Sequence, residues 1–227
     1  MSWWTKKAKN PFNFYTSVKL RELTGKKARN LRELAEIIKE VPGSVIYYHT
    51  HVFLQRRQRL SPEPPNAFAY WISRALGEYK LAEEVAAIDI CEFNTIRELR
   101  EKIIATIENH LFESKEPLRY APEGMEFDFV KAHSFIMPTG FKAHNLKEFE
   151  MVLEKITIHS IYFHIFEARL RLEKGINDFS FWIDTSLGAP ELGRIIESLD
   201  PYTFTMESLR RKLIDIIRDW CTGVERK

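Results

Sequence analysis

The stretch Val45-Ile46-Tyr47-Tyr48-His49 occurs twice in this chain of 227 residues. Its second copy is Ser160-Ile161-Tyr162-Phe163-His164, 115 positions later. The same offset pairs Thr24-Gly25 with Thr139-Gly140, and it shortens to 111 and then 110 toward the end of each copy. Tryptophan, glycine and histidine recur at matched positions, which is typical of a tandem duplication.

The duplication predicts the organisation of nearly the whole chain. We expect two pseudo-two-fold-related halves packed as one compact unit, and two separate domains are the alternative, because a repeat of this length could fold alone. The expected segments are an N-terminal arm (1–11), repeat one (12–110), a linker (111–126) and repeat two (127–221).

The fold class expected from these repeats is mainly α, with about five helices in each repeat. A short extended segment should open each repeat, because Phe12 and Phe14 alternate with polar residues, as do Phe127 and Phe129. A Thr-Gly pair then turns the chain, and a helix begins at the capping-box spacing Asn30-Leu-Arg-Glu33.

The remaining helices are predicted from caps, glycines and helix-forming residues. The second copy of the opening stretch continues into Glu167-Ala-Arg-Leu-Arg-Leu-Glu173, which favours a helix where the first copy alone resembles a strand. Asn66 and Asn177 should cap a third helix. The expected fourth and fifth helices are 79–88 and 95–110 in repeat one, and 190–199 and 205–221 in repeat two.

Composition excludes several classes of protein. Apolar residues make up 44% of the chain, yet no run approaches the 18 apolar residues of a transmembrane helix. The start of the chain lacks the apolar core of a signal peptide. Cys91 and Cys221 have no metal-binding spacing, so we expect both to be reduced, in a cytoplasmic protein.

The charge is unevenly distributed along the chain. Residues 1–60 contain 13 Lys or Arg and 4 Glu, a balance of +9, whereas the remainder carries −7. One interpretation is a nucleic-acid surface. The other is a solvated face that pairs with the acidic remainder, which fits basic residues scattered through amphipathic patterns.

Three groups of residues resemble a known family. They are Thr24-Gly-Lys-Lys-Ala-Arg-Asn30-Leu, the run from Pro42 to His51 containing Tyr-Tyr-His-Thr-His, and Ser61-Pro-Glu-Pro-Pro-Asn66. Phe163-His164, Glu167 to Glu173 and Asn177-Asp-Phe-Ser extend the likeness. The chain, over about 12–218, is similar to a family of uncharacterised prokaryotic proteins known as a domain of unknown function. That resemblance implies no activity and no catalytic residue.

The second helix of each repeat carries the candidate binding residues. Spacings of three, four and seven place His49 and Arg56 on one helical face, and likewise His164 and Arg171, with Glu167 beside them. If the two faces converge, these residues form a pocket for a phosphate or carboxylate together with Tyr47 or Tyr162. The alternative is a pair of core histidines that bond to the backbone, with arginines reaching solvent.

No motif supports a cofactor, a metal or a catalytic residue. His49 and His51 point about 200° apart on a helix and would not chelate one ion. The expected function is therefore a non-catalytic binding or regulatory protein for an anionic small molecule or a protein partner. An enzyme using His49 or His164 as general base is the alternative, and nucleic-acid binding is the second alternative. The oligomeric state is left open.

Overall fold

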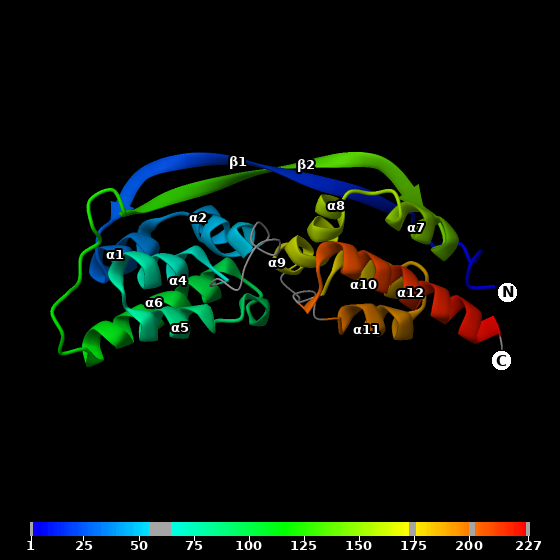
Figure 1. Ribbon diagram of the computed structural model, residues 1–227. Coiled ribbons are helices and arrows are strands. Elements are labelled where there is room, and N and C mark those ends of the chain that lie inside the picture. Colours follow the sequence, from blue (N-terminus) through cyan, green and yellow to red (C-terminus); the bar gives the residue numbers. More distant parts are fainter. Residues whose placement is uncertain (1, 55–64, 173–175, 200–202, 226–227) are drawn as a thin grey trace. The chain divides into compact units, whose positions relative to one another are not determined.

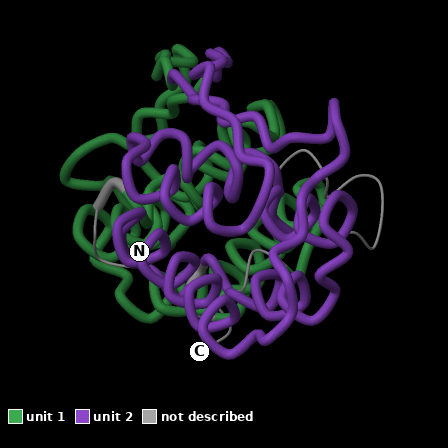
Figure 2. Tube along the Cα trace, turned by 90° about the vertical axis from the view of Figure 1, so that its left-hand side faces the viewer, with its two compact units in different colours: residues 1–18, 134–227 green, residues 19–133 purple. Residues whose placement is uncertain are grey.

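The computed structural model describes residues 2–54, 65–172, 176–199 and 203–225 (Figure 1). The chain divides into two compact units, coloured separately in Figure 2. Unit 2 is the continuous segment 19–133. Unit 1 combines residues 1–18 with residues 134–227, so unit 2 is inserted between its two parts. These boundaries differ from the ranges 12–110 and 127–221, which were predicted from the internal repeat of the sequence.

The mainly α fold class with pseudo-symmetric halves is wrong, because two long strands make the fold mixed α and β. Strands β1 (Phe12–Ala28) and β2 (Phe127–Ala143) have 17 residues each and form one antiparallel two-stranded sheet. The division between the units falls within both strands.

The sequence predicted that each Thr-Gly pair would turn the chain after a short extended segment. In the structure, the pairs do not end the strands. Gly25 has a φ of 75° and Gly140 a φ of 80°, a left-handed conformation that glycine adopts without strain. The hydroxyl of Thr24 donates to the carbonyl of Phe129, and that of Thr139 donates to the carbonyl of Phe14. The strands therefore continue through these positions, and the threonines help to bind one strand to the other.

The helices of unit 2 begin directly after β1. They are α1 (Leu31–Glu40), α2 (Gly43–Tyr47), the π-helical turn η1 (Tyr48–Val52), α4 (Ala67–Trp71), the π-helical turn η2 (Ile72–Leu76), α5 (Tyr79–Ala86), the short 3₁₀ turn η3 (Ile90–Glu92) and α6 (Ile96–Glu113). Helix α6 packs against α1, α2 and α5.

The helices of unit 1 follow β2 in a similar order. They are α7 (Leu146–Leu153), α8 (Ile158–Tyr162), the π-helical turn η4 (Phe163–Glu167), α9 (Ala168–Leu172), α10 (Asp178–Thr185), α11 (Pro190–Glu197) and α12 (Met206–Glu225). Helix α12 packs against α7, α8 and α11.

Several predicted helix starts are confirmed by their caps. The Asn30 side chain accepts the backbone N–H of Glu33 at 2.9 Å. Thr95 and Glu98 form the full reciprocal capping box at the start of α6. Asn66 and Asn177 cap α4 and α10. These bonds join residues three positions apart, which is why the sequence pattern locates them.

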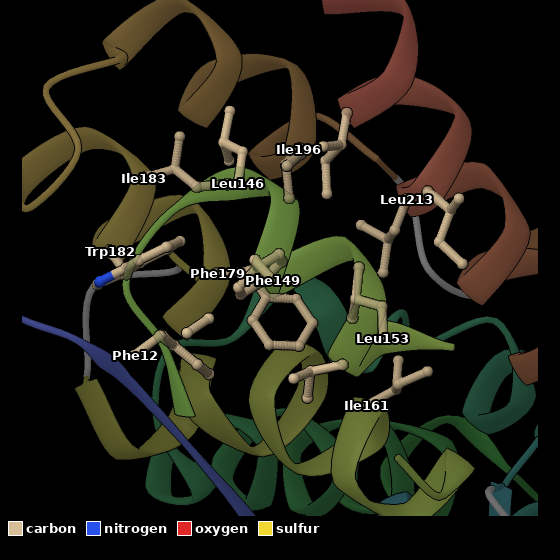
Figure 3. Close-up of a cluster of buried hydrophobic side chains, with 14 of the residues drawn as sticks. Phe12, Leu146, Phe149, Leu153, Ile161, Phe179, Trp182, Ile183, Ile196 and Leu213 are labelled. Atoms are coloured by element: carbon tan, nitrogen blue, oxygen red, sulfur yellow. The ribbon is translucent and has the colours of Figure 1, made fainter. Parts of the chain in front are cut away.

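The core of unit 1 is built around Phe149 of α7 (Figure 3). Its ring stacks on Trp182 of α10, with centroids 5.1 Å apart, and meets Phe179 edge-on at 5.1 Å. Phe12 and Phe14 of β1 complete this cluster, with centroids 5.4 and 5.3 Å from Phe149. The opening phenylalanines of the chain are therefore buried among helices that lie more than 130 residues away in sequence.

Unit 2 takes its strand phenylalanines from β2. Phe127 stacks on Phe68 at 5.2 Å and meets Trp71 at 5.7 Å. Phe129 is fully buried and contacts Phe127 at 4.9 Å. The core of unit 1 is thus completed by β1, which precedes the helices of unit 2. The core of unit 2 is completed by β2, which precedes the helices of unit 1.

The N-terminal arm is packed onto unit 1. Trp3 meets Trp220 of α12 edge-on, with centroids 5.9 Å apart, and the ammonium of Lys6 lies 4.2 Å from the Trp3 ring. The backbone N–H of Ala8 donates to the carbonyl of His144 at 2.7 Å. The two adjacent tryptophans, Trp3 and Trp4, pack against the core of this unit.

We expect Trp3→Ala to lower the free energy of unfolding by about 1–2 kcal/mol, through loss of the aromatic and cation–π contacts. Urea denaturation measures the change. Phe112→Ala removes a ring that is 91% exposed on α6 and serves as the control, with an expected change below about 0.5 kcal/mol. Equal stability of wild type and Trp3→Ala would contradict the docked arm.

Candidate functional site

His164 links the helices of unit 1 to strand β1. It lies in η4 and is almost fully buried. Its Nε2 accepts the backbone N–H of Tyr15 at 2.9 Å, and its Nδ1 lies 2.7 Å from a carboxylate oxygen of Asp178. Because Nε2 accepts, the single ring proton is on Nδ1 and is donated to Asp178. His164 is therefore a neutral connector and is not placed to remove a proton from a ligand.

His49 makes the corresponding strand contact in unit 2. Its Nε2 accepts the backbone N–H of Val130 of β2 at 2.9 Å. The ring is surrounded by Phe127 and Phe68, at centroid distances of 4.6 and 5.5 Å. Burial lowers the pKa of His49 to about 3, so this side chain is neutral at physiological pH. The structure therefore favours the core-histidine interpretation over a general base.

The two candidate tyrosines also lie in separate units. The Tyr47 ring stacks on His51, with centroids 5.2 Å apart, and lies 5.7 Å from the ammonium of Lys19. Tyr162 is buried and stacks on Phe166 at 4.5 Å. Each tyrosine is part of an aromatic pair within its own unit.

Of the three charged candidate residues, the structure describes the side chain of Glu167 and leaves those of Arg56 and Arg171 undescribed. Glu167 accepts a hydrogen bond from the hydroxyl of Ser17 of β1 at 2.9 Å. Arg171 lies in α9, and its side chain is outside the described part of the structure, as is all of Arg56. The expected seven-residue stripe also assumed α-helical geometry. The π-helical turns η1 and η4 change the number of residues per turn and so alter which residues share a face.

A pocket of about 470 Å³ lies beside His164 in unit 1. Most of its walls come from three elements, namely the N-terminal end of β1, the turn η4 and the helix α10. Its lining residues are Asn10, Pro11, Phe12, Asn13, Tyr15, Ile136, Phe163, His164, Asp178, Phe181, Trp182, Thr185 and Ser186. The pocket combines aromatic walls with amide and hydroxyl groups and one carboxylate, as small-molecule sites commonly do.

Trp182 fixes one wall of this pocket. Its indole N–H donates to the carbonyl of Asn10 at 2.8 Å, which holds the arm against α10. In unit 2, the indole N–H of Trp71 donates to the carbonyl of Met125 at 2.6 Å. Trp182 and Trp71 thus occupy matched positions, and the indole N–H group of each can serve as a probe of its own unit.

Of the residues selected from sequence whose side chains the structure describes, only His164 lines the pocket. Sequence analysis did not identify three other lining residues, Tyr15, Asp178 and Phe181. A usable signal was present, because Asp178 follows the cap Asn177 where Ala67 follows the cap Asn66. Because Ala67 follows its cap equally well, helix capping does not require a charged residue at this position. The charge at Asp178 is therefore a difference between the two copies that capping does not explain.

The basic residues of the first sixty positions are partly neutralised. Several pair with carboxylates of unit 2: Lys26 with Glu40, Lys27 with Asp128, Arg29 with Glu33, and Lys39 with Glu108. Two of these pairs, Lys27–Asp128 and Lys39–Glu108, join the basic first sixty positions to the acidic remainder of the chain. The basic residues at 56, 57 and 59 lie outside the described residues.

Over the described ranges, no cluster of three or more His, Cys, Asp or Glu side chains is arranged to hold a metal ion. Among the helices that the structure describes, none has the length and apolar character needed to cross a membrane.

Comparison with known proteins gives a family and a structural relative. The structure of OrfY from Thermoproteus tenax is 30% identical and superposes with a TM-score of 0.79. The match covers 93% of this chain and 96% of the OrfY chain. No curated protein matches the chain. Residues 9–218 match a protein family described only as being of unknown function (DUF5752), and this chain belongs to that family.

Proposed function

We propose that this protein is a non-catalytic binding protein whose ligand site is the pocket beside His164 in unit 1. The observation that carries the proposal is the His164 geometry at this pocket. One ring nitrogen is bonded to the Tyr15 amide and the other to Asp178, so the histidine shapes the site without being available for proton transfer.

The size and walls of the pocket support a small-molecule ligand. A volume of about 470 Å³ lies in the range of small-molecule sites, roughly 300–1,000 Å³. Phe181 and Tyr15 are 45% and 36% exposed, so their rings are accessible to a ligand. Asn13 and Thr185 also line the pocket and add groups that can form hydrogen bonds.

An anionic ligand fits this pocket poorly. Among the lining residues that the structure describes there is no lysine or arginine, and Asp178 contributes a carboxylate. An anion would therefore meet the like charge of this carboxylate. The pocket supports a neutral or cationic ligand instead, which replaces the anionic small molecule expected from the His and Arg spacing.

Binding can be tested by observing the Trp182 indole N–H by NMR during titration with a library of small metabolites. We expect at least one compound to shift the Trp182 resonance in a saturable way while leaving that of Trp71 unchanged. Trp182→Phe and Trp71→Phe assign the two signals. Phe181→Ala removes a pocket wall and should weaken binding about tenfold, equivalent to about 1.4 kcal/mol.

Phe112→Ala is the matched control, because it removes an exposed ring from unit 2. Two results would count against the site: no compound shifts Trp182, or Phe181→Ala binds as tightly as Phe112→Ala.

We further propose a cytoplasmic location and a prokaryotic origin for the family. The chain contains two cysteines, Cys91 and Cys221, and this sparing use of cysteine supports a reducing compartment. The full-length likeness to a chain from Thermoproteus tenax supports the origin, and we take the Thr24–Leu31, Tyr47–His51 and Ser61–Asn66 segments as motifs of the family. An alignment of many members in which these segments vary freely would remove them as motifs.

A further inference from the structure

We infer that the ligand of the unit 1 pocket carries a planar aromatic ring that stacks on Phe181. The inference rests on the proposed function and adds the chemical class of the ligand. Three observations carry it: the open ring of Phe181, the covered ring of its counterpart in unit 2, and the small residues that stand in unit 1 where the covering residues stand in unit 2.

Phe181 places an accessible aromatic ring at the pocket. It lies in α10, lines the pocket and is 45% exposed. None of the residues that the structure describes places an aromatic ring or a cationic group against it. The neighbouring Trp182 differs, because its ring is stacked on Phe149 with centroids 5.1 Å apart. Phe181 is therefore the ring of α10 that can receive a stacking partner from outside the chain.

The counterpart of Phe181 in unit 2 is Tyr70, at the offset of 111 that relates this part of the two copies. The centroid of the Phe53 ring lies 6.3 Å from that of Tyr70, and the guanidinium carbon of Arg74 lies 5.9 Å from the same centroid. A planar guanidinium and an aromatic ring both pack favourably on an aromatic face. Unit 2 thus covers the ring at this position with flat groups of its own.

The two covering residues have small counterparts in unit 1. The position matched to Phe53 is Ala168, and the position matched to Arg74 is Thr185. The hydroxyl of Thr185 donates to the carbonyl of Phe181 at 2.7 Å, so this side chain is bonded back to its own helix while it lines the pocket. The groups that cover the ring in unit 2 are therefore missing at the matched positions of unit 1, and a flat ligand can take their place.

The other walls of the pocket also suit a ring. Tyr15 is 36% exposed, and its centroid lies 6.5 Å from that of Phe163, which lines the same pocket. Ile136 of β2 adds an aliphatic wall at the position matched to Arg21 of unit 2. Contacts between aromatic rings are more favourable than the burial of the same area alone. A ligand with an aromatic ring therefore gains more in this pocket than an aliphatic ligand of the same size.

The test compares benzamide with cyclohexanecarboxamide, which carries the same uncharged carboxamide on a saturated, puckered ring. The saturated ring is the more hydrophobic, so burial of apolar area alone would favour it. Each probe is titrated into the full chain while the Trp182 and Trp71 indole N–H signals are followed, and affinity is taken from the saturation of the shift. We expect benzamide to shift Trp182 alone and to bind at least about fivefold more tightly, a difference of about 1 kcal/mol.

Phe181→Leu and Thr185→Arg are the test variants. Phe181→Leu keeps an apolar wall without a ring, so we expect benzamide affinity to fall about fivefold and cyclohexanecarboxamide affinity to stay unchanged. Thr185→Arg restores the residue that covers the ring in unit 2, and it should lower benzamide affinity by at least about fivefold. Thr185→Ser keeps the hydroxyl and is the control, with unchanged affinity. A cooperative urea transition shows that each variant is folded, and the wild-type comparison of the two probes needs no variant.

The outcomes separate this inference from the proposed function. Equal affinities of the two probes, or a preference for benzamide that survives Phe181→Leu, overturns stacking on Phe181 and leaves the pocket as a ligand site. If benzamide leaves Trp182 unshifted while an aliphatic library compound shifts it, the ligand class is wrong and the site stands. If neither probe nor any library compound shifts Trp182, both proposals fail.

Discussion

A fragment of residues 19–133 is expected to fold by itself, whereas a fragment of residues 12–110 is expected to remain unfolded. The first is the continuous unit 2 and includes Phe127 and Phe129, which fill its core. The second ends before both rings and before Val130, the donor to His49. Removing a single buried phenylalanine ring costs about 3–5 kcal/mol. Two such losses approach the whole stability of a typical domain, about 5–15 kcal/mol.

Circular dichroism and amide NMR distinguish the two fragments. The 19–133 fragment should give dispersed resonances and a cooperative urea transition, and the 12–110 fragment should give neither. A cooperative transition in the shorter fragment would contradict the exchange of strands between the units.

The same exchange predicts where single substitutions act in the full chain. Phe129→Ala should destabilise unit 2 by about 3–5 kcal/mol, and its counterpart Phe14→Ala should destabilise unit 1 by a similar amount. The indole signals of Trp71 and Trp182 report on the two units separately. If Phe14→Ala instead broadened the Trp71 signal alone, the assignment of strand ends to units would be incorrect.

Unit 2 is expected to lose about 4 kcal/mol of stability between pH 7 and pH 5 through two buried histidines. Burial lowers the pKa of His49 to about 3, and burial together with the charge of Lys19 lowers that of His51 to about 3. In the unfolded chain both return to their ordinary value, near 6.5. Between these values the unfolded state binds more protons, so stability is full above about pH 6.5 and falls as the pH decreases toward 3.

Urea denaturation at pH 7, 6 and 5 measures this loss, and His51→Phe provides a matched variant. Phe166 stacks on Tyr162 in unit 1 as His51 stacks on Tyr47 in unit 2, so phenylalanine suits the position. We expect His51→Phe to remove about half of the pH dependence, or about 2 kcal/mol. A variant with the same pH dependence as wild type would show that His51 does not titrate in this way.

Sequence reasoning located the local elements of this fold well. The caps at Asn30, Thr95 and Asn177 and the burial of Phe12, Phe14, Phe127 and Phe129 follow from patterns within a few residues. Reasoning from the same patterns failed beyond residue 14 of β1. Val18 and Leu20 continue the apolar series, yet they are 44% and 56% exposed.

The candidate site was found in part. His164 was selected for its matched histidine, and it does line the pocket. Its bonds join it to Tyr15, 149 positions earlier, and to Asp178, 14 positions later. The π-helical turns η1 and η4 were not anticipated, because a helical wheel assumes one fixed number of residues per turn.

By itself, the sequence determined where helices begin and which phenylalanines are buried, since caps and periodicity act over one helical turn. It also marked Tyr-Tyr-His and its counterpart as important positions. Only the tertiary structure decided that each strand completes the unit of the other half, and that His49 and His164 hold those strands through backbone amides. The physical reason is that a buried ring or ring nitrogen needs some partner, and local patterning does not specify which segment more than a hundred residues away provides it.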